Sequence, residues 1–372
     1  MKIGIVTFHD EKNYGAVLQT FALQEVLRSI GYQPCIVGFH PHIVTKQWHP
    51  VPLSKINNFT KLAKAVSERI IFRRSVARCR SEFWRFFREH YSQTEPLYES
   101  YEALTTSPPD CDAFIVGSDQ VWNPKCCHPR YFLEFAGAGA KRISYAASGI
   151  SALPEKWTET YRNALAKFSH ISCREPQGCS VVNKLLGTGK AELVLDPTLL
   201  YTTSDWEQLL SSSPPDIDLP DSPYILVYDH SNKSVTTDIA EYLKRKSPKG
   251  TELVLTGPFD KKYWDRRFDR KYCVGPVNFL HLIRKAKLVV TVSFHGTILS
   301  YLLRTPFLTV LPSAVQDVRI SHLLDTLRLP QRRISGIDDL PADWASVDFG
   351  LGSQHLHVKR EESLQFLRGI AT

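Results

Sequence analysis

The most informative hydrophobic pattern of the chain lies between residues 287 and 303. Residues 288–292 (LVVTV) form a nearly continuous apolar run, which is typical of a strand buried on both faces of a parallel sheet. Apolar residues then recur at helical spacing from Ile298, so Ser293 to Gly296 fall on a turn from strand to helix. Since this carboxyl end of a strand borders the ligand crevice in open parallel sheets, the pattern predicts a ligand-binding turn.

His295 is the chemically distinctive residue of this turn. The N-terminus of a helix offers free N–H groups and a partial positive charge, which suit a phosphate. A histidine there can bind an anion and also move a proton. Because core packing does not need an imidazole at a turn, the position favours a functional histidine over a structural one.

The same alternation of short apolar runs and helical patterns extends along the chain. Two successive βα series, joined by a proline-rich linker at residues 202–223, predict an α/β protein. We expect two Rossmann-like, doubly wound domains that face each other across a cleft. Strands are expected at residues 2–8, 34–39, 111–117, 141–146, 170–173, 191–195, 224–228, 252–255, 288–292 and 307–310.

The expected domain boundaries follow from the linker. An N-terminal domain is expected over residues 1–205 and a C-terminal domain over 206–330. Residues 331–372 are expected to form a tail that ends in a helix near 359–368.

Residues 56–90 differ in character, because they combine a helical pattern with many arginines and aromatic residues. The stretch 69–88 leaves two interpretations. An amphipathic basic helix can lie on an anionic membrane or an acidic partner. Alternatively, its aromatic face packs on the protein itself while the arginines stay solvated, and we favour this second interpretation.

Composition and cysteine usage narrow the class of protein. The chain has 372 residues, a formal net charge of +8 and eight scattered cysteines, which favours a reducing cytosol over a disulfide framework. We identify no signal peptide and no run of the roughly 18 apolar residues that a membrane span needs. Cys126-Cys127-His128 lacks a second ligand pair, so a zinc site is disfavoured. Zincin, P-loop, G-x-S-x-G and G-x-G-x-x-G motifs are missing.

Polar clusters follow several predicted strands, where sites are built in such sheets. The sequence Asp110-Cys111-Asp112 matches the D-x-D metal motif of nucleotide-sugar transfer. It precedes its strand, however, so we expect it away from the crevice. The clusters are His9 to Gly15, Ser118 to Asn123, Ser148-Gly149, Arg174-Glu175 and Ser293 to Gly296.

Together these segments resemble the polysaccharide pyruvyl transferase family. The matching pieces are IGIVTFHDEKNYGAVLQTFALQ, DAFIVGSDQVWNP, RISYAASGI, ISCREPQG, LVLDPTLL and AKLVVTVSFHGTILSYLLRTPFL, in the family's order over residues 3–312. The resemblance implies a GT-B-like fold and a metal-independent enzyme without a cofactor. It implies transfer of a pyruvyl group from phosphoenolpyruvate to a sugar of a cell-surface glycan or its lipid-linked precursor, with the acceptor on the N-terminal domain and the donor phosphate on the C-terminal domain.

The resemblance also implies which residues form the site. Arg174 and His295 are the donor-binding pair, and Asp119 is the candidate base or orienter for the acceptor hydroxyl. Arg174 could instead be an ion-pair partner of Glu175, and Asp119 could cap the following turn. Further substrate-binding candidates are Asn13, Gly15, Ser118, Gln120, Trp122, Ser148, Ser293, Phe294, Gly296 and Thr297.

One position departs from the family pattern. Some members carry an arginine two residues before the histidine, where this chain has Ser293. We therefore expect the missing phosphate contact to be absent or to come from Lys125, Arg130 or Arg304.

Two other functions compete with pyruvyl transfer: a GT-B glycosyltransferase that uses a nucleotide sugar, and a non-catalytic glycan- or anion-binding protein. The expected partners are phosphoenolpyruvate and a glycan acceptor, with nucleic acid disfavoured. We expect a cytoplasmic location, with peripheral contact at the inner face of the membrane left open by the basic stretch.

Overall fold

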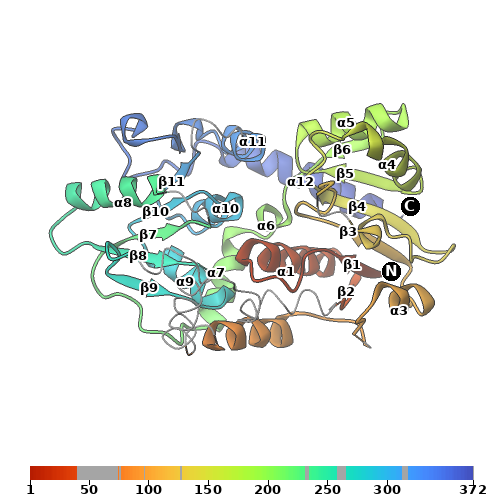
Figure 1. Cartoon of the computed structure of the whole chain (residues 1–372), viewed down its shortest axis with the longest axis horizontal. Helices are drawn as coiled ribbons and strands as arrows, with labels where there is room; N and C mark the ends of the chain where they lie inside the picture. The colour runs from red at the N-terminus through yellow and green to blue at the C-terminus, as the bar shows by residue number, and fades with distance from the viewer. Residues whose placement is uncertain are drawn as a thin grey trace, which may run out of the picture.

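The computed structural model describes residues 1–39, 74, 77–95, 97–125, 128–230, 234–257, 265–311 and 317–371. This part of the chain forms two α/β domains side by side, each built on a six-stranded sheet (Figure 1). The two sheets hold only parallel strand pairs, as the buried apolar runs predict.

The first sheet has the strand order β2-β1-β3-β4-β5-β6, which reverses direction between β1 and β3. Loops after β1 and β3 therefore flank the crevice of the N-terminal domain. Its strands are β1 (Lys2–Val6), β2 (Gln33–Ile36), β3 (Ala113–Val116), β4 (Lys141–Ala147), β5 (His170–Cys173) and β6 (Ala191–Leu193). The accompanying helices are α1 (Tyr14–Ser29), α3 (Tyr101–Thr106), α4 (Thr158–Leu165), α5 (Pro176–Leu186) and α6 (Pro197–Leu200).

The second sheet has the order β12-β11-β10-β7-β8-β9, with its reversal between β7 and β10. The turn that carries His295 follows β10, so it lies at the crevice of the C-terminal domain. The strands are β7 (Tyr224–Tyr228), β8 (Glu252–Thr256), β9 (Arg270–Tyr272), β10 (Leu288–Thr291), β11 (Phe307–Val310) and β12 (Arg333–Ile334). The helices are α7 (Thr203–Ser212), α8 (Val235–Lys246), α9 (Pro276–Lys285), α10 (Phe294–Leu302), α11 (Val318–Thr326) and α12 (Ser353–Gly369).

Most differences from the sequence expectations occur in short or polar segments. Two strands, β9 and β12, were not expected, because three and two residues of mixed polarity give no apolar run. The expected linker contains α7, whose start is fixed by a capping box between Thr202 and Asp205. The final helix is longer than expected and begins at Ser353.

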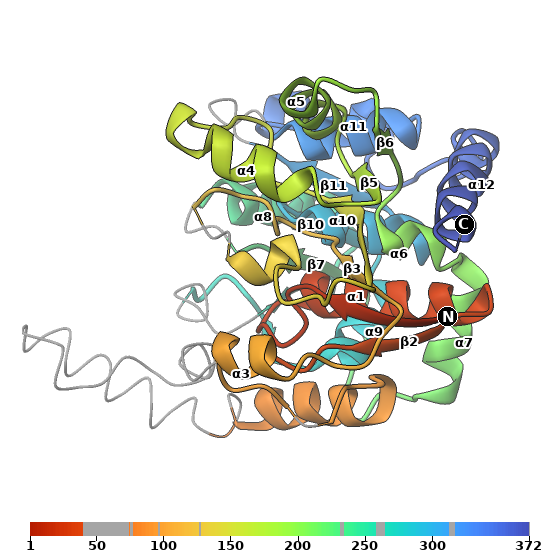
Figure 2. The same cartoon turned by 90° about the vertical axis from the view of Figure 1, so that its right-hand side faces the viewer.

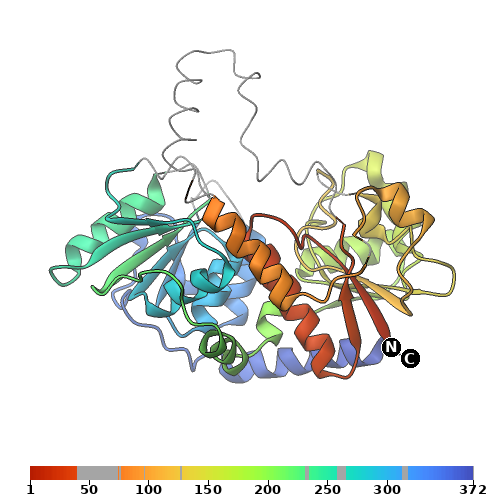
Figure 3. The same ribbon diagram turned by 90° about the horizontal axis from the view of Figure 1, so that it is seen from below.

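The last helix ties the C-terminal domain back to the N-terminal one. α12 crosses beneath both domains, and both chain ends lie on the same side of the N-terminal domain (Figures 2 and 3). The Ser363 hydroxyl accepts a hydrogen bond from the Leu195 amide at 3.0 Å, and the Tyr32 hydroxyl donates to the Leu367 carbonyl at 3.0 Å.

Residues 77–90 form a second connection, a helix that lies across the two domains (Figure 3). Phe83 is buried and stacks on Tyr14 at 5.5 Å between ring centroids. Glu82 accepts hydrogen bonds from the Gly275 amide at 2.5 Å and from the Asn278 side chain at 2.9 Å, so it ties this helix to the start of α9. The described part of the basic stretch thus packs its aromatic face on the protein, whereas residues 56–73 lie outside the described residues.

The residues that the structure describes hold neither a membrane-spanning helix nor a metal-binding cluster. Within these ranges no helix is both long and apolar enough to cross a membrane. The same ranges contain no group of three or more His, Cys, Asp or Glu side chains placed to hold a metal ion.

Candidate active site

The turn after β10 is organised by its own residues. Ser293 is the N-cap of α10, and its hydroxyl accepts a hydrogen bond from the Gly296 amide at 3.2 Å. The Thr297 amide donates to the Ser293 carbonyl at 3.0 Å, and the Thr297 hydroxyl donates to the same carbonyl at 3.0 Å. The amides of Gly296 and Thr297, which we expected at a phosphate, are therefore engaged within the turn.

His295 lies where the two domains meet. It is 7% exposed, and its Nε2 lies 3.4 Å from Oδ2 of Asp196 without the alignment of a hydrogen bond. Its ring packs on Gly15, because a Cβ atom at residue 15 would lie 2.2 Å from Nδ1 of His295. Gly15 thus permits a close approach, and the group that approaches is the imidazole of the other domain.

Asp196 is the centre of the site, and sequence reasoning missed it as a site residue. Its Oδ2 accepts hydrogen bonds from the Ser118 hydroxyl and from Nη1 of Arg174, both at 2.9 Å, and its Oδ1 accepts from the Thr198 amide at 3.0 Å. Burial by itself raises the pKa of Asp196, but the His295 imidazole and the Arg174 guanidinium outweigh burial and hold it well below its ordinary range. The available signal was its place shortly after β6, as the N-cap of α6.

Arg174 is buried and its guanidinium already has protein partners. Nε donates to Glu175 Oε1 at 2.8 Å and Nη2 donates to the Ser148 hydroxyl at 3.0 Å, in addition to the bond to Asp196. Burial alone would lower the pKa of Arg174, but the carboxylates of Glu175 and Asp196 raise it above its usual value. The expected donor-binding pair is therefore brought together through Asp196, with the arginine in a positioning role in the ligand-free protein.

Asp119 lies half-buried after β3 in a left-handed conformation, with φ of 69°. Its Oδ1 accepts a hydrogen bond from the amide of Gln120 at 2.8 Å, and its carbonyl accepts from the amide of Ser148 at 3.0 Å. The carboxylate thus caps its own turn, as the alternative interpretation held. Its charge also raises the pKa of Arg174, so the two side chains share one electrostatic environment.

Glu11 is a second residue that the sequence did not single out. Burial, together with the charges of Asp119 and Asp10, raises the pKa of Glu11 to about 7, and Arg130 opposes this rise. A carboxyl group that titrates near neutral pH can exchange protons with a substrate. Its position in the loop between β1 and α1 is shared with the predicted cluster His9 to Gly15.

Several other candidates form hydrogen bonds within the protein that stabilise the fold around the site. Trp122 is fully buried and its Nε1 donates to the Tyr131 carbonyl at 3.1 Å, so the structure places it in the core and not at the substrate. Asn13 is exposed and caps α1 by accepting from the Gly15 amide at 2.9 Å. Gln120 accepts a hydrogen bond from the Asn123 side chain at 2.8 Å.

The three cations expected to replace the missing arginine have different positions. Arg304 follows the far end of α10, roughly 13 Å along the helix from His295, so it is too far away to supply the missing phosphate contact. Lys125 is exposed in the N-terminal domain. Arg130 lies over the Phe39 ring at 4.3 Å and donates to the Tyr131 hydroxyl at 2.5 Å, and it is the one whose charge acts on Glu11.

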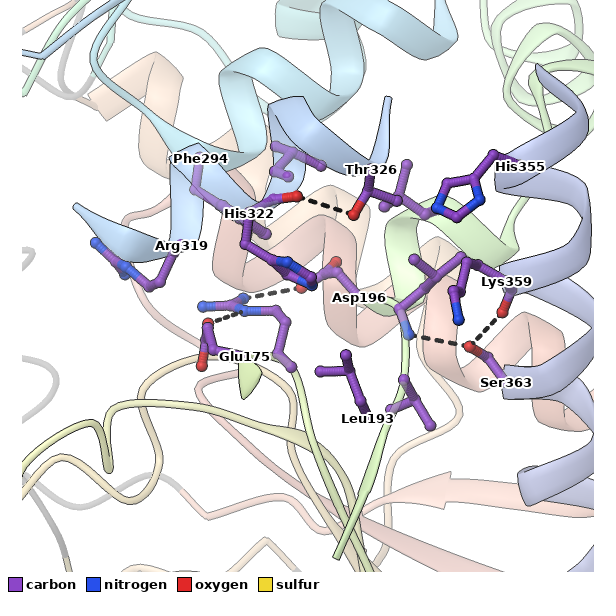
Figure 4. Close-up of a pocket in the computed structure, with 15 residues that line it drawn as sticks. Glu175, Leu193, Asp196, Phe294, Arg319, His322, Thr326, His355, Lys359 and Ser363 are labelled. Carbon is purple, nitrogen blue, oxygen red and sulfur yellow. Dashed lines mark hydrogen bonds and ion pairs between the residues drawn. The ribbon is translucent and has the colours of Figure 1, made fainter. Parts of the chain in front are cut away.

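A pocket opens onto this cluster between the domains (Figure 4). Arg174, Asp196 and Phe294 line it together with side chains of α11 and α12, whereas His295 is not among its lining residues. The space it encloses for a bound molecule is about 80 Å³, which suits a small anionic group rather than a whole sugar nucleotide. The Arg174 guanidinium lies over the Phe294 ring at 4.3 Å, so Phe294 contacts the site as expected.

A known protein family resembles this chain in sequence, and solved structures resemble it in fold. The family model described as polysaccharide pyruvyl transferase matches residues 13–313. No curated protein matches the chain.

Two solved structures share the fold, a GT-B-like pair of Rossmann-like domains. Anabaena Alr3699/HepE in complex with UDP and glucose is similar over 99% of this chain and 100% of that chain, with 10% identity and a TM-score of 0.52. Arabidopsis thaliana UGT89C1 complexed with UDP-L-rhamnose is similar over 99% of this chain and 98% of that chain, with 12% identity and a TM-score of 0.50. At such identities the likeness concerns the fold alone.

Proposed function

The chain belongs to the polysaccharide pyruvyl transferase family, and from this premise we propose that it moves the pyruvyl group of phosphoenolpyruvate onto a hexose. The acceptor is a cell-surface polysaccharide or its lipid-linked precursor, and the products are a pyruvate ketal and phosphate. The observation that carries the proposal is His295 of one domain at 3.4 Å from Asp196 of the other, next to the buried Arg174.

The proposed chemistry requires one proton to be supplied and two to be removed. Protonation of the methylene carbon of phosphoenolpyruvate makes the adjacent carbon electrophilic, and a sugar hydroxyl attacks it. Loss of phosphate and attack by a second hydroxyl of the same sugar close the ketal. Each of the two hydroxyls gives up its proton, one of which balances the proton taken up by the methylene group and the other leaves with phosphate.

The side chains of the site suit these steps. His295 is the group that exchanges a proton with the donor, since its imidazole lies where the two domains meet, beside Asp196 and next to the buried Arg174. Asp196 orients the imidazole, and Arg174 and Thr198 hold Asp196 in place. Asp119, in the loop after β3 of the N-terminal domain, orients the acceptor hydroxyl or takes its proton.

On this proposal the side chains alone support transfer, with no metal and no organic cofactor. Turnover is expected to be unchanged by EDTA, and a loss that added Mg²⁺ restores would contradict this part. We also propose that the enzyme acts in the cytoplasm, with any membrane contact peripheral. Cell fractionation that finds the protein outside the cytoplasm would contradict this location.

The test is acceptor-dependent phosphate release from phosphoenolpyruvate, with the ketal detected by mass spectrometry. The variant His295→Ala is expected to lose at least about 100-fold in rate, because a positioned proton donor contributes that much. His357→Ala, an exposed histidine on α12, is the matched control and should turn over normally. Full turnover by His295→Ala would overturn the role of His295.

The rival nucleotide-sugar transferase makes an opposite prediction. A ligand that binds only the native state raises the melting temperature, so phosphoenolpyruvate should do so and UDP-sugars should not. Turnover of a UDP-sugar without turnover of phosphoenolpyruvate would reject the proposed function. Saturable glycan binding without any turnover would favour a binding protein instead.

A further inference from the structure

Phosphoenolpyruvate brings two anionic groups into a site whose expected cation is already neutralised. All three nitrogens of Arg174 donate to protein side chains, two of them to the carboxylates of Glu175 and Asp196. The amides of Gly296 and Thr297 are engaged in the α10 turn, and residue 293 is a serine. If the proposed function holds, on which this inference rests, other groups must hold the donor phosphate.

The pocket beside Phe294 supplies such groups from two further helices. Arg319 and His322 come from α11, and His355 and Lys359 come from α12 (Figure 4). Leucine side chains line much of the remaining wall, so charges in the pocket act through a less polar medium than bulk water.

The partners of these four side chains differ. Arg319 forms an ion pair with Asp317 at 2.6 Å, and Lys359 forms one with Glu362 at 2.8 Å on the outer part of α12. The imidazoles of His322 and His355 make no hydrogen bond or ion pair with any residue that the structure describes. Both carboxylates in the pocket, those of Glu175 and Asp196, are bound to Arg174, so they compete weakly for the Arg319 and Lys359 cations. Burial lowers the pKa of His322, so its imidazole is available as a neutral N–H donor.

We propose that His322 and Lys359, with Arg319 at the mouth, bind the phosphate group of phosphoenolpyruvate in this pocket. On this proposal the phosphate lies in the same pocket as the Arg174 and Asp196 side chains, and the enol carbon is directed past Asp196 toward His295, whose Nε2 is 3.4 Å from Asp196. Imidazole and ammonium groups are suitable donors to phosphate oxygens. The cations of α11 and α12 thereby take over the contact that the family arginine makes and Ser293 cannot make.

The arrangement has a structural consequence. α11 belongs to the C-terminal domain, whereas α12 is bound to the N-terminal domain through Ser363 and Tyr32. An anion between His322 and Lys359 therefore bridges the two domains and fixes the width of the cleft.

The experiment measures phosphoenolpyruvate kinetics for the double variant His322→Gln/Lys359→Met. The expected result is a KM at least about tenfold higher with kcat within about threefold of wild type, because hydrogen bonds to a charged group that are equal in ground and transition states affect binding alone. The matched control is His357→Gln/Lys287→Met, two exposed residues outside the pocket, with an unchanged KM. An unchanged KM in the pocket variant overturns the inference and leaves the proposed function standing.

A second measurement separates this inference from the proposed function. Inorganic phosphate is expected to raise the melting temperature of the wild type and of the control variant, and to lose at least half of this effect in the pocket variant. If the wild type shows no turnover of phosphoenolpyruvate, the proposed function fails, and the phosphate shift alone decides whether the pocket binds phosphate. An equal shift in all three proteins overturns the pocket. The single variant His322→Gln provides the same test if the double variant does not fold.

Discussion

The pocket beside Phe294 combines two groups of side chains that differ in how their positive charge and hydrogen-bond donors are used. In one group, which we call the closed side, Arg174 is buried and bound by two carboxylates and a hydroxyl. In the other group, the open side, His322 and His355 line an open pocket without hydrogen-bond partners among the described residues. The closed side holds catalytic groups in place at the cost of desolvated charges, and the open side keeps its donors available to a ligand.

The sharpest way to break this comparison is the variant Asp196→Asn, which removes the charge at the centre of the closed side. It is expected to lower the free energy of unfolding by about 3 kcal/mol, because it leaves the buried Arg174 partly uncompensated, and to lower kcat at least about 100-fold. Urea denaturation and phosphate release measure the two effects. Asp216→Asn, at an exposed ion pair with Arg85, is the control and should cost less than about 1 kcal/mol. Equal costs for the two variants would contradict the central role of Asp196.

The variant Gly15→Ala tests how tightly the closed side holds His295. The added methyl group would lie 2.2 Å from Nδ1, so the imidazole or the domain must move. A displacement of this size is expected to lower kcat about 100-fold while phosphate still raises the melting temperature. Gly139→Ala, where a Cβ atom meets nothing within 4 Å, is the control. Normal kcat in Gly15→Ala would show that the contact has no catalytic role.

The variant Glu11→Gln tests whether the charges of Asp119 and Asp10 reach the Glu11 carboxyl group and raise its pKa. Burial, then Asp119 and Asp10, raises the pKa of Glu11 from 4.5 to about 7, so its contribution to stability is present below pH 4.5 and lost as the pH rises through 7. Between pH 5 and 8 the wild type is therefore expected to lose about 2 kcal/mol relative to Glu11→Gln, after allowance for partial solvent exposure. Urea titrations at a series of pH values measure the difference, and parallel curves would refute the assignment.

The smallest effect is expected for Arg304→Ala. This variant tests whether a cation outside the pocket contributes to phosphate binding. Arg304 is exposed at the end of α10 away from His295, so the KM for phosphoenolpyruvate should stay within about twofold of wild type. A tenfold rise in KM would mean that the phosphate binds elsewhere than beside α11 and α12.

The sequence predicted the fold well because the fold depends on patterns that are local. Apolar runs such as residues 288–292 show a buried strand directly, and the turn at His295 follows from the change to helical spacing. The strands β9 and β12 have too few residues for such a pattern. The GT-B-like arrangement came from the order of several motifs rather than from any single one.

The site was predicted less completely because its contacts are long-range. Arg174 and His295 were chosen as a pair, and the structure places both against Asp196, which comes into reach only when β6 lies beside β5. Trp122 was chosen for its place in a polar cluster, and no local pattern reveals that its ring turns into the core. His322 and Lys359 lie in helices whose positions depend on how the second domain and α12 fold back.

The attachment of α12 affects how the protein is made. The surface beside β6 and α6 is synthesised early, but it receives Ser363 and Arg360 only after the whole C-terminal domain has left the ribosome. At roughly 5–20 residues per second, that surface waits about 8 to 30 seconds with Leu195 and Leu199 uncovered. A nascent chain in this state is a natural client for a holdase chaperone, and pausing of translation between residues 206 and 352 would prolong the interval in which it can aggregate.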